Sequence, residues 1–361
     1  MQTINVLVVD DSAFMRKMIT DILQSHPRIH VVDTARNGKD ALKKVQQFNP
    51  DVVTLDVEMP LMDGITALKQ IMSEQPRPVV MLSSLTREGA DRTIESISLG
   101  AVDFIEKPSG SISLNIREKE DEIKAKVLQA VDANIPNLAE TPKKEPTVPS
   151  FTQQVRQSVR NTKPIVGIGT STGGPRALQQ VLTRLPKEFP APIVIVQHMP
   201  AGFTESLAKR LNNMSQIEVK EAENGEVLKN GTAYIAPGGY QMRVETNGGI
   251  SKIRISKEDP RNGHQPSVDV LFESMASLHA YQVYAVIMTG MGHDGSNGLI
   301  RLKKKKANTI AISEAKETCV VYGMPQAAEK TNLVNVVAEL PQISDVLIKQ
   351  MKSRGESNGN E

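Results

Sequence analysis

The feature that most constrains the fold is an alternation of two kinds of segment, which occurs once on each side of a proline-rich stretch. Apolar, β-rich runs of strand length alternate with amphipathic segments of helix length. This alternation is typical of βαβ units, in which parallel strands form a sheet and helices cover its faces. A length of 361 residues, at about 150 residues per domain, also favours two domains. We therefore expect two doubly wound α/β domains.

The first set of segments contains five repeats. Its expected strands are residues 5–9, 30–35, 52–56, 79–83 and 103–105, and its expected helices include 13–24, 39–48 and 90–99. In the first helix, the spacing of Phe14, Met18 and Ile22 predicts one apolar face that is buried in the core. We assign residues 1–122 to this five-stranded parallel domain.

The composition changes between the two sets of segments. A charged helix at 117–133 is expected to close the first domain, and four prolines follow it among polar residues. We therefore assign residues 123–160 to this helix and a mobile linker. The second domain is predicted at 161–352, with strands at 165–169, 193–197, 233–236, 284–289 and 309–313. The polar tail, 353–361, is expected to be disordered.

The composition also argues against several classes of protein. The formal net charge is only +2, and no basic stripe interleaved with aromatic residues suggests a nucleic-acid surface. Apolar runs are far shorter than the roughly 20 residues of a membrane span. The N-terminus lacks the basic segment and cleavage site of a secretory signal, and the single Cys319 cannot form an internal disulfide. We expect a cytoplasmic protein with no membrane insertion.

Polar residues at strand ends of the first domain form the first candidate site. Asp10 and Asp11 follow the first strand, and Asp56 ends the third. The carboxyl ends of such strands share one crevice, where three carboxylates repel one another unless a cation, such as Mg²⁺, joins them. Ser83 and Lys107 end or follow later strands and could hold an anion attached to Asp56. The alternative is that the acids merely cap the helices that follow.

Together these residues resemble the receiver domain of two-component response regulators, over residues 3 to about 122. The resemblance implies a flavodoxin-like fold with Asp56 as the phosphoacceptor. It implies that Mg²⁺, needed for phosphorylation, is bound by Asp10, Asp11, Asp56 and the Glu58 carbonyl. It also implies that the switch residues are Ser83, Lys107 and Phe104, although Phe104 could equally be an ordinary core residue.

A glycine-rich segment, 167–175, follows the first strand of the second domain. It does not fit a dinucleotide-binding loop, because the third glycine is Gly173 and not residue 172. It does not fit a phosphate-binding loop, because Pro175 stands where lysine is required. It does fit the G-x-S-x-G pattern through Gly169, Ser171 and Gly173, which would raise Ser171 on a sharp strand-to-helix turn.

Two other strand ends supply partners for this serine. His198 follows strand 193–197, and Asp294 lies shortly after strand 284–289, so a Ser171-His198-Asp294 triad is possible. The serine would attack a carbonyl, the histidine would take its proton, and the aspartate would hold the imidazole. The alternatives are a structural histidine, an Asp-Gly turn, a loop that only binds an anion, and other reactive residues, namely Cys319, His264 and His293.

Six short motifs of the second domain are similar to those of the chemotaxis protein-glutamate methylesterase family. They are STGG at 171–174, QHMP at 197–200, APG at 236–238, PSVD at 266–269, TGMG with DG at 289–295, and CVVYGMP at 319–325. The resemblance implies hydrolysis of glutamate methyl esters on the cytoplasmic helices of chemoreceptors, with methanol release, and deamidation of receptor glutamines.

The same resemblance implies further expectations about this site. The Met291 N–H would be the oxyanion donor, Thr172 would lie beside the nucleophile, and no cofactor would be needed for ester hydrolysis. A chemotaxis histidine kinase would be the phosphodonor, and we expect a monomer. From the residues alone, hydrolysis of a small-molecule ester remains an alternative.

Overall fold

The structure is a computed structural model that describes residues 3–84, 86–107, 116, 119–135 and 162–355. The chain divides into two compact units, Met1–Thr141 and Pro142–Glu361. Most of the predicted linker, at 136–160, and the end of the predicted tail, at 356–361, lie outside the described residues.

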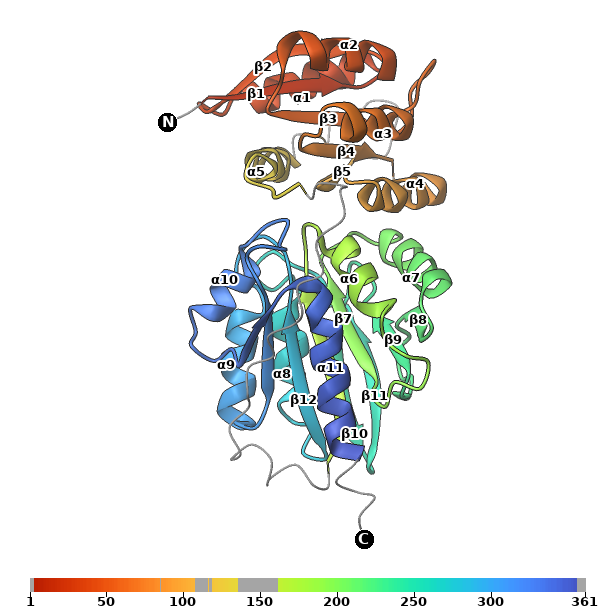
Figure 1. The fold of residues 1–361 in the computed structure, drawn as a ribbon, viewed down its shortest axis with the longest axis vertical. Coiled ribbons are helices and arrows are strands. Elements are labelled where there is room, and N and C mark those ends of the chain that lie inside the picture. The colour runs from red at the N-terminus through yellow and green to blue at the C-terminus, as the bar shows by residue number, and fades with distance from the viewer. Residues whose placement is uncertain (1–2, 85, 108–115, 117–118, 136–161, 356–361) are drawn as a thin grey trace. The chain divides into compact units, whose positions relative to one another are not determined.

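The first unit is built on a five-stranded sheet of order β2-β1-β3-β4-β5, in which every pair is parallel (Figure 1). This is the flavodoxin-like order, so the predicted fold is confirmed. The strands are β1 Ile4–Val9, β2 Ile29–Ala35, β3 Val52–Asp56, β4 Val79–Ser83 and β5 Asp103–Glu106. The helices are α1 Ala13–Gln24, α2 Gly38–Phe48, α3 Gly64–Glu74, α4 Arg87–Ser98 and α5 Glu120–Ala130.

The predicted buried face of α1 is wrong in part. Phe14 is 44% exposed, and the buried stripe runs instead through Met15, Ile19 and Ile22. These three residues recur at intervals of four and three, which places them on one side of the helix. The helix begins after Ser12, whose hydroxyl accepts a hydrogen bond from the Met15 N–H, and this cap places Phe14 on the exposed side.

Helix α5 is an integral part of the first unit. Its apolar residues Ile123, Val127 and Ala130 are buried, and the helix contacts α1 and strands of the sheet. From the sequence we expected this helix to close the first domain but assigned the boundary to residue 122, inside the helix; the structure groups the whole helix with the first unit. Burial of one apolar stripe explains why the helix stays with the sheet despite its many charged residues.

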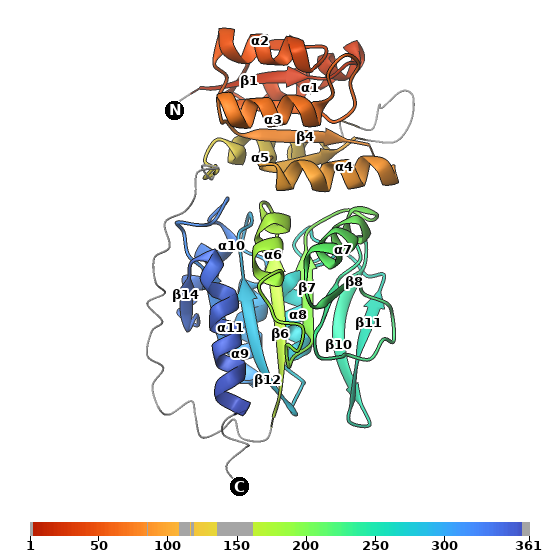
Figure 2. The same ribbon diagram turned by 45° about the vertical axis from the view of Figure 1, so that its right-hand side comes forward.

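The second unit contains a seven-stranded parallel sheet of order β14-β13-β12-β6-β7-β9-β8 (Figure 2). The strands are β6 Lys163–Thr170, β7 Ile193–Gln197, β8 Glu218–Glu221, β9 Thr232–Ile235, β12 Tyr281–Ile287, β13 Ile310–Glu314 and β14 Val336–Ala338. From β6 the chain builds one side of the sheet and then crosses back to β12 on the other. Residues after β6 therefore lie at the switch point where ligands usually bind.

Helices cover both faces of this sheet. They are α6 Gly174–Leu182, α7 Phe203–Met214, α8 Val268–Met275, α9 Ser296–Lys305, α10 Met324–Glu329 and α11 Leu340–Gly355. Helices α6 and α11 lie side by side on one face, and α8 and α9 lie together on the other (Figures 1 and 2). Helix α11 runs to Gly355, so the prediction that the tail begins at 353 is wrong. Its one proline, Pro341, lies in the first turn, where proline is tolerated, and no glycine precedes Gly355 in the helix.

The sequence did not predict an antiparallel hairpin of β10 Gln241–Asn247 and β11 Ile250–Ser256. Gly248 and Gly249, both at positive φ, form its two-residue turn. The hairpin lies beside α8, and Met242, Val244 and Ile253 join the core cluster of this unit. It therefore braces the helix that holds part of the site described next.

Candidate functional site

Ser171 directly follows β6, at the switch point of the second sheet. Its N–H donates to the Thr289 carbonyl at 3.0 Å, and its own carbonyl accepts a hydrogen bond from the Gln197 side-chain amide at 2.9 Å. The chain just after β12 and the last residue of β7 thus both form hydrogen bonds with the backbone of this residue. The serine is fixed on a tight turn, as the G-x-S-x-G spacing predicted.

Two glycines allow this turn to form. Gly173 has a φ of +77° and begins α6, and a Cβ there would lie 2.6 Å from Val320. Gly290, from the loop after β12, approaches the serine so closely that a Cβ would lie 2.7 Å from the Ser171 Cβ. Any side chain at either position would displace the serine or its supporting loop.

His198 stands beside the serine because β6 and β7 are paired in register. Thr170 is opposite Gln197, and the ladder continues with a hydrogen bond from the His198 N–H to the Thr170 carbonyl at 3.2 Å. The imidazole Nε2 lies 2.8 Å from Asp294 Oδ2. The structure thus brings together the predicted histidine and aspartate at the same sheet edge.

Asp294 is a buried carboxylate that receives several hydrogen bonds. The Val268 N–H donates at 2.7 Å, the Asp269 N–H at 3.1 Å and the Ser267 hydroxyl at 2.9 Å. Burial alone would raise the pKa of Asp294, but the hydrogen bonds from His198 and from these backbone groups lower it below its usual value. The aspartate is therefore ionised at neutral pH.

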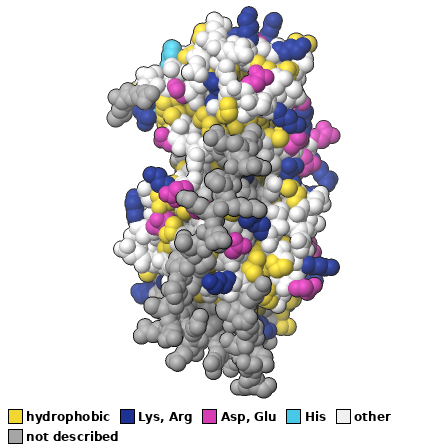
Figure 3. Space-filling model, viewed as in Figure 1, with side chains coloured by type: hydrophobic (Ala, Val, Ile, Leu, Met, Phe, Trp, Pro, Cys, Tyr) yellow, Lys and Arg dark blue, Asp and Glu magenta, His cyan; other side chains and the backbone are white. Residues whose placement is uncertain are grey.

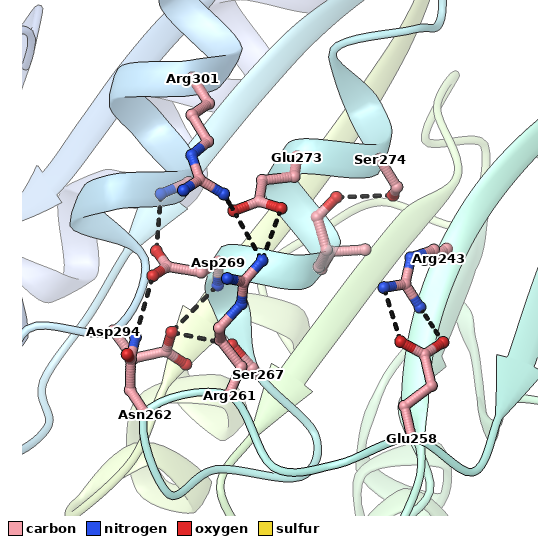
Figure 4. Close-up of polar contacts among 12 residues, drawn as sticks. Arg243, Glu258, Arg261, Asn262, Ser267, Asp269, Glu273, Ser274, Asp294 and Arg301 are labelled. Atoms are coloured by element: carbon pink, nitrogen blue, oxygen red, sulfur yellow. Dashed lines mark hydrogen bonds and ion pairs between the residues drawn. The ribbon is translucent and has the colours of Figure 1, made fainter.

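Asp294, Ser267 and Asp269 lie close together at the start of α8 (Figure 4), and the N-termini of α8 and α9 are joined by an exchange of carboxylates. Asp294, just before α9, accepts the first N–H groups of α8, while Asp269 of α8 accepts the N–H groups of Gly295 at 2.9 Å and Gly298 at 2.6 Å. Each carboxylate satisfies amides that a helix N-terminus leaves unpaired. The PSVD motif at 266–269 thus fixes the position of the triad aspartate.

The ionised Asp294 can only accept hydrogen bonds, so Nε2 of His198 carries the proton of this pair. Nδ1 then has the free lone pair. It is buried and has no hydrogen-bond partner among the residues that the structure describes. Among the described residues, Ser171 Oγ forms no hydrogen bond with this ring. Hydrogen bonds between catalytic groups are often long without substrate and shorten when substrate binds.

His264 stacks on the catalytic candidate His198, a contact that the sequence did not reveal. The two ring centroids are 3.8 Å apart and the planes differ by 4°. Burial and then the nearby His198 lower the pKa of His264 to about 4, so it is neutral at physiological pH. His264 belongs to a tight turn at 261–264, and only the folding of that turn brings it to the sheet edge.

The predicted oxyanion donor, Met291, lies on the loop after β12, whereas Thr172 directly follows Ser171. Among the described residues, the Met291 N–H has no hydrogen-bond partner, so it is available to a substrate oxygen. Thr172 is buried next to Ser171, and its carbonyl accepts the Thr289 hydroxyl at 3.0 Å.

Cys319, the alternative nucleophile, is buried. Burial first, and then the nearby Glu314, raise the pKa of its thiol far above the usual value. A thiol that stays protonated is a poor nucleophile, so the local chemistry disfavours this alternative.

The acids of the first unit gather as predicted. One oxygen each of Asp10, Asp11 and Asp56 lies within 4.8 Å of the others. Lys107 Nζ contacts Asp10 Oδ2 at 2.7 Å and Asp56 Oδ2 at 2.8 Å. Burial raises the pKa of Asp56 to about 6, with Asp10 adding to the effect and Lys107 opposing it. One ammonium group faces two buried carboxylates and a third nearby, so a hard divalent cation fits this oxygen cluster.

Glu58, Ser83 and Phe104, the other predicted receiver residues, differ in their contacts with the site around Asp56. The Glu58 N–H approaches Asp56 Oδ1 at 3.4 Å. The Ser83 hydroxyl is buried and donates to the Gly89 carbonyl of α4 at 3.2 Å. Among the recorded bonds of the described residues, none joins Ser83 to Asp56. Phe104 is buried in this structure, as the core interpretation expected.

The surface of the described residues carries charges of both signs. In the view of Figure 3, Lys and Arg side chains are interspersed with Asp and Glu. Within the described ranges, every helix is too short or too polar to cross a lipid bilayer.

Sequence comparisons match both units. A sequence profile of the CheB methylesterase family matches residues 166–347, and one of the response regulator receiver domain matches residues 6–117. A protein-glutamate methylesterase/protein-glutamine glutaminase from Halalkalibacterium halodurans is 54% identical over 349 residues, covering 97% of this chain and 99% of the relative. The chain belongs to the CheB methylesterase family.

Other relatives of this CheB-family chain agree with this assignment. A protein of the same name from Bacillus subtilis is 47% identical and covers 94% of this chain and 96% of its own length. The crystal structure of the Thermotoga maritima CheB methylesterase catalytic domain is 43% identical, with a TM-score of 0.51, and covers 52% of this chain and 99% of that one. The similarity therefore includes the fold of the second unit.

Proposed function

We propose that this chain is a serine esterase, regulated by phosphorylation, that hydrolyses glutamate methyl esters on chemoreceptors in chemotactic adaptation. Methanol is the released product. The observation that carries this proposal is the arrangement at the edge of the second sheet, where Ser171 sits on a strand-end turn and His198 is hydrogen-bonded to a buried, ionised Asp294. The family assignment supplies the substrate class.

The proposed mechanism is acyl transfer through the serine. Ser171 Oγ attacks the ester carbonyl as His198 Nδ1 takes its proton, and Asp294 stabilises the imidazolium. The oxyanion accepts a hydrogen bond from the Met291 N–H, and Thr172 lies beside the nucleophile. Collapse releases methanol with the proton from His198. Water then hydrolyses the acyl-enzyme by the same steps and leaves a free glutamate.

Deamidation of glutamine uses the same acyl-enzyme, with ammonia in place of methanol as the leaving group. An ester has the better leaving group, so we expect methyl esters to react faster than amides. The small-molecule esterase alternative lacks a specific observation in its favour. Methanol release from methylated receptor, measured on the purified chain with and without a phosphodonor, tests the proposal directly.

We propose that the first unit receives a phosphoryl group on Asp56 from a chemotaxis histidine kinase. Asp10, Asp11, Asp56 and the Glu58 carbonyl would hold Mg²⁺, which offsets negative charge as the phosphoryl group arrives. The acyl phosphate carries about two negative charges where the free carboxylate carries one, and Lys107 is already in place to pair with this added charge. Ser83 would turn from α4 toward the phosphoryl group, and Phe104 would repack.

Replacing Asp56 with asparagine is expected to abolish activation by a phosphodonor. The amide has nearly the same shape as the carboxylate, so the first unit keeps its fold, but it cannot form the acyl phosphate. Methanol release measured with and without acetyl phosphate should therefore be equal in Asp56→Asn and different in the wild type. Activation of this variant to the wild-type level would place the phosphoacceptor elsewhere.

Chelation of divalent cations is expected to stop phosphorylation while leaving ester cleavage by the unphosphorylated chain unchanged. The triad described above needs no metal for any of its proton transfers. Phosphoprotein formation and basal methanol release, each measured with and without EDTA, separate the two activities. Loss of basal hydrolysis on chelation would point to a metal-dependent esterase.

The remaining expectations on partners and location belong to the same proposal. We propose that the cytoplasmic helices of chemoreceptors are the substrate and that the enzyme acts as a cytoplasmic monomer. The buried, unpaired thiol of Cys319 is compatible with a reducing compartment.

A further inference from the structure

Glu314, the last residue of β13, is a fully buried carboxyl group that the mechanism above does not use. One of its oxygens, Oε2, accepts a hydrogen bond from the Thr289 N–H at 2.8 Å. The other, Oε1, is buried and has no partner among the described residues. Strands β12 and β13 are paired in register up to Ile287 and Ser313, so the Glu314 side chain meets the chain just after β12 ends.

Thr289 in turn forms hydrogen bonds with three consecutive residues around the proposed nucleophile, namely Thr170, Ser171 and Thr172. Its carbonyl accepts the Ser171 N–H at 3.0 Å and the Thr170 hydroxyl at 2.8 Å, and its own hydroxyl donates to the Thr172 carbonyl at 3.0 Å. The same hydroxyl accepts the Val321 N–H at 3.0 Å. Thr289 also precedes, by two residues, the proposed oxyanion donor Met291. Its position therefore affects both the nucleophile and the oxyanion site.

We propose that Glu314 is a positioning residue of the esterase, which fixes the loop carrying Ser171 through its hydrogen bond to Thr289. This inference rests on the proposed role of Ser171 as the nucleophile. The carboxyl group has no direct contact with the triad in the recorded bonds of the described residues. Its effect is to hold Thr289 where it can bind the loop before substrate arrives, and catalysis is sensitive to such placement.

The surroundings of Glu314 favour its neutral form more than water does. The titratable group next to it is the Cys319 thiol, and beyond that thiol lie the acids Glu317 and Glu329. Glu314 is paired with Ala338 of β14, and among the described residues no cation acts on its carboxyl group. Burial raises the pKa of Glu314 to about 7, while the Thr289 N–H and the nearby Thr318 and Cys319 side chains oppose this rise. Ionisation of Glu314 at higher pH adds a negative charge next to the loop that carries Met291. That charge repels the negative charge that develops on the substrate oxygen during the reaction.

Two substitutions separate this role from simple packing. Glu314→Gln keeps an acceptor for the Thr289 N–H and cannot ionise, whereas Glu314→Leu fills similar space and leaves that N–H unpaired. Methanol release from methylated receptor by the full-length chain should show a kcat about 10- to 100-fold lower for Glu314→Leu, with KM changed by less than about twofold. The glutamine variant should retain the wild-type kcat at pH 6.5.

The pH profile supplies a readout that a packing role would not change. Wild-type kcat should fall on the alkaline side with an apparent pKa near 7, and Glu314→Gln should lack this fall. At pH 9 the glutamine variant should exceed the wild type by about threefold or more. The matched control is Glu329→Gln, because Glu329 bonds to Ser313 and Tyr322 and not to Thr289, and its profile should follow the wild type.

Three results would decide against the proposal or its basis. If Glu314→Leu is folded by circular dichroism and retains kcat, the positioning role is wrong. If Glu314→Leu does not fold, identical pH profiles for wild type and Glu314→Gln overturn it instead. Ser171→Ala is measured in parallel, and full turnover by that variant would refute the proposed nucleophile, whereas an inactive Ser171→Ala beside unaffected Glu314 variants refutes only the role of Glu314.

Discussion

Replacing Ser171 with alanine should lower methanol release by about 10⁴- to 10⁶-fold, the usual cost of removing the nucleophile of a triad. This equals about 5 to 8 kcal/mol of transition-state stabilisation at 1.36 kcal/mol per tenfold. The hydroxyl of Ser171 makes no recorded hydrogen bond in the described part of the chain, so the substitution should change the free energy of unfolding by less than about 1 kcal/mol. Turnover on methylated receptor and thermal unfolding together check both statements.

The matched control for this prediction is Cys319→Ala. Cys319 is the only thiol in the chain and lies near the same loops, but it is buried and its pKa is raised. We expect its replacement to cost some stability, because a buried side chain is truncated, and to leave the turnover of the folded enzyme nearly unchanged. An active Ser171→Ala together with an inactive, folded Cys319→Ala would reverse the assignment of the nucleophile.

Replacing His198 with alanine is expected to be about as damaging as removing the serine, by about 10⁴-fold or more, because it removes the proposed acceptor of the Ser171 proton. Asp294 would keep its bonds to the N-terminus of α8, so the local fold should persist. The measurement is kcat for methanol release, with circular dichroism as the check on folding.

His264→Ala is the control for this second prediction. His264 stacks on the ring of His198 but has a pKa of about 4 and makes no recorded bond to Asp294 in the described residues. Loss of the stack should lower kcat by no more than about tenfold, an effect of the size expected for one ring contact. If His264→Ala is inactive and His198→Ala is mild, His264 is the general base.

The candidate site could be predicted largely because its residues sit at strand ends. Parallel strands of one sheet place the residues that follow them at one edge, so apolar runs ending in Ser171, His198 and Asp56 were informative without any coordinates. Lys107 was found in the same way, and it does contact Asp56. The sequence pattern fixes only the edge, however, and not the direction of a side chain. Ser83 shows this limit, because its hydroxyl binds α4.

The parts that could not be predicted depend on loops that fold back. His264 reaches His198 only through the tight turn at 261–264, and no periodic pattern announces such a contact. Asp269 accepts hydrogen bonds from the N-terminus of α9, and Asp294 accepts them from that of α8. Predicting these bonds would require knowing how the two helices are placed relative to each other. Glu314 did carry a signal, since a carboxylate that closes an apolar strand run is uncommon, and a buried charge needs an explanation.

The in-register pairing of β6 with β7 has a consequence for how the imidazole is used. Adjacent strands lie about 4.8 Å apart, so residues 171 and 198, each one step beyond its strand, have main chains close together. Of the two ring nitrogens, Nδ1 is nearer its own main chain, and Nε2 extends farther, here to Asp294. Nδ1 is thus left for the neighbouring Ser171, and Nε2 reaches Asp294 on the loop after β12. In this chain the spacing of β6 and β7 therefore favours the tautomer with its proton on Nε2, which leaves Nδ1 as the base for Ser171.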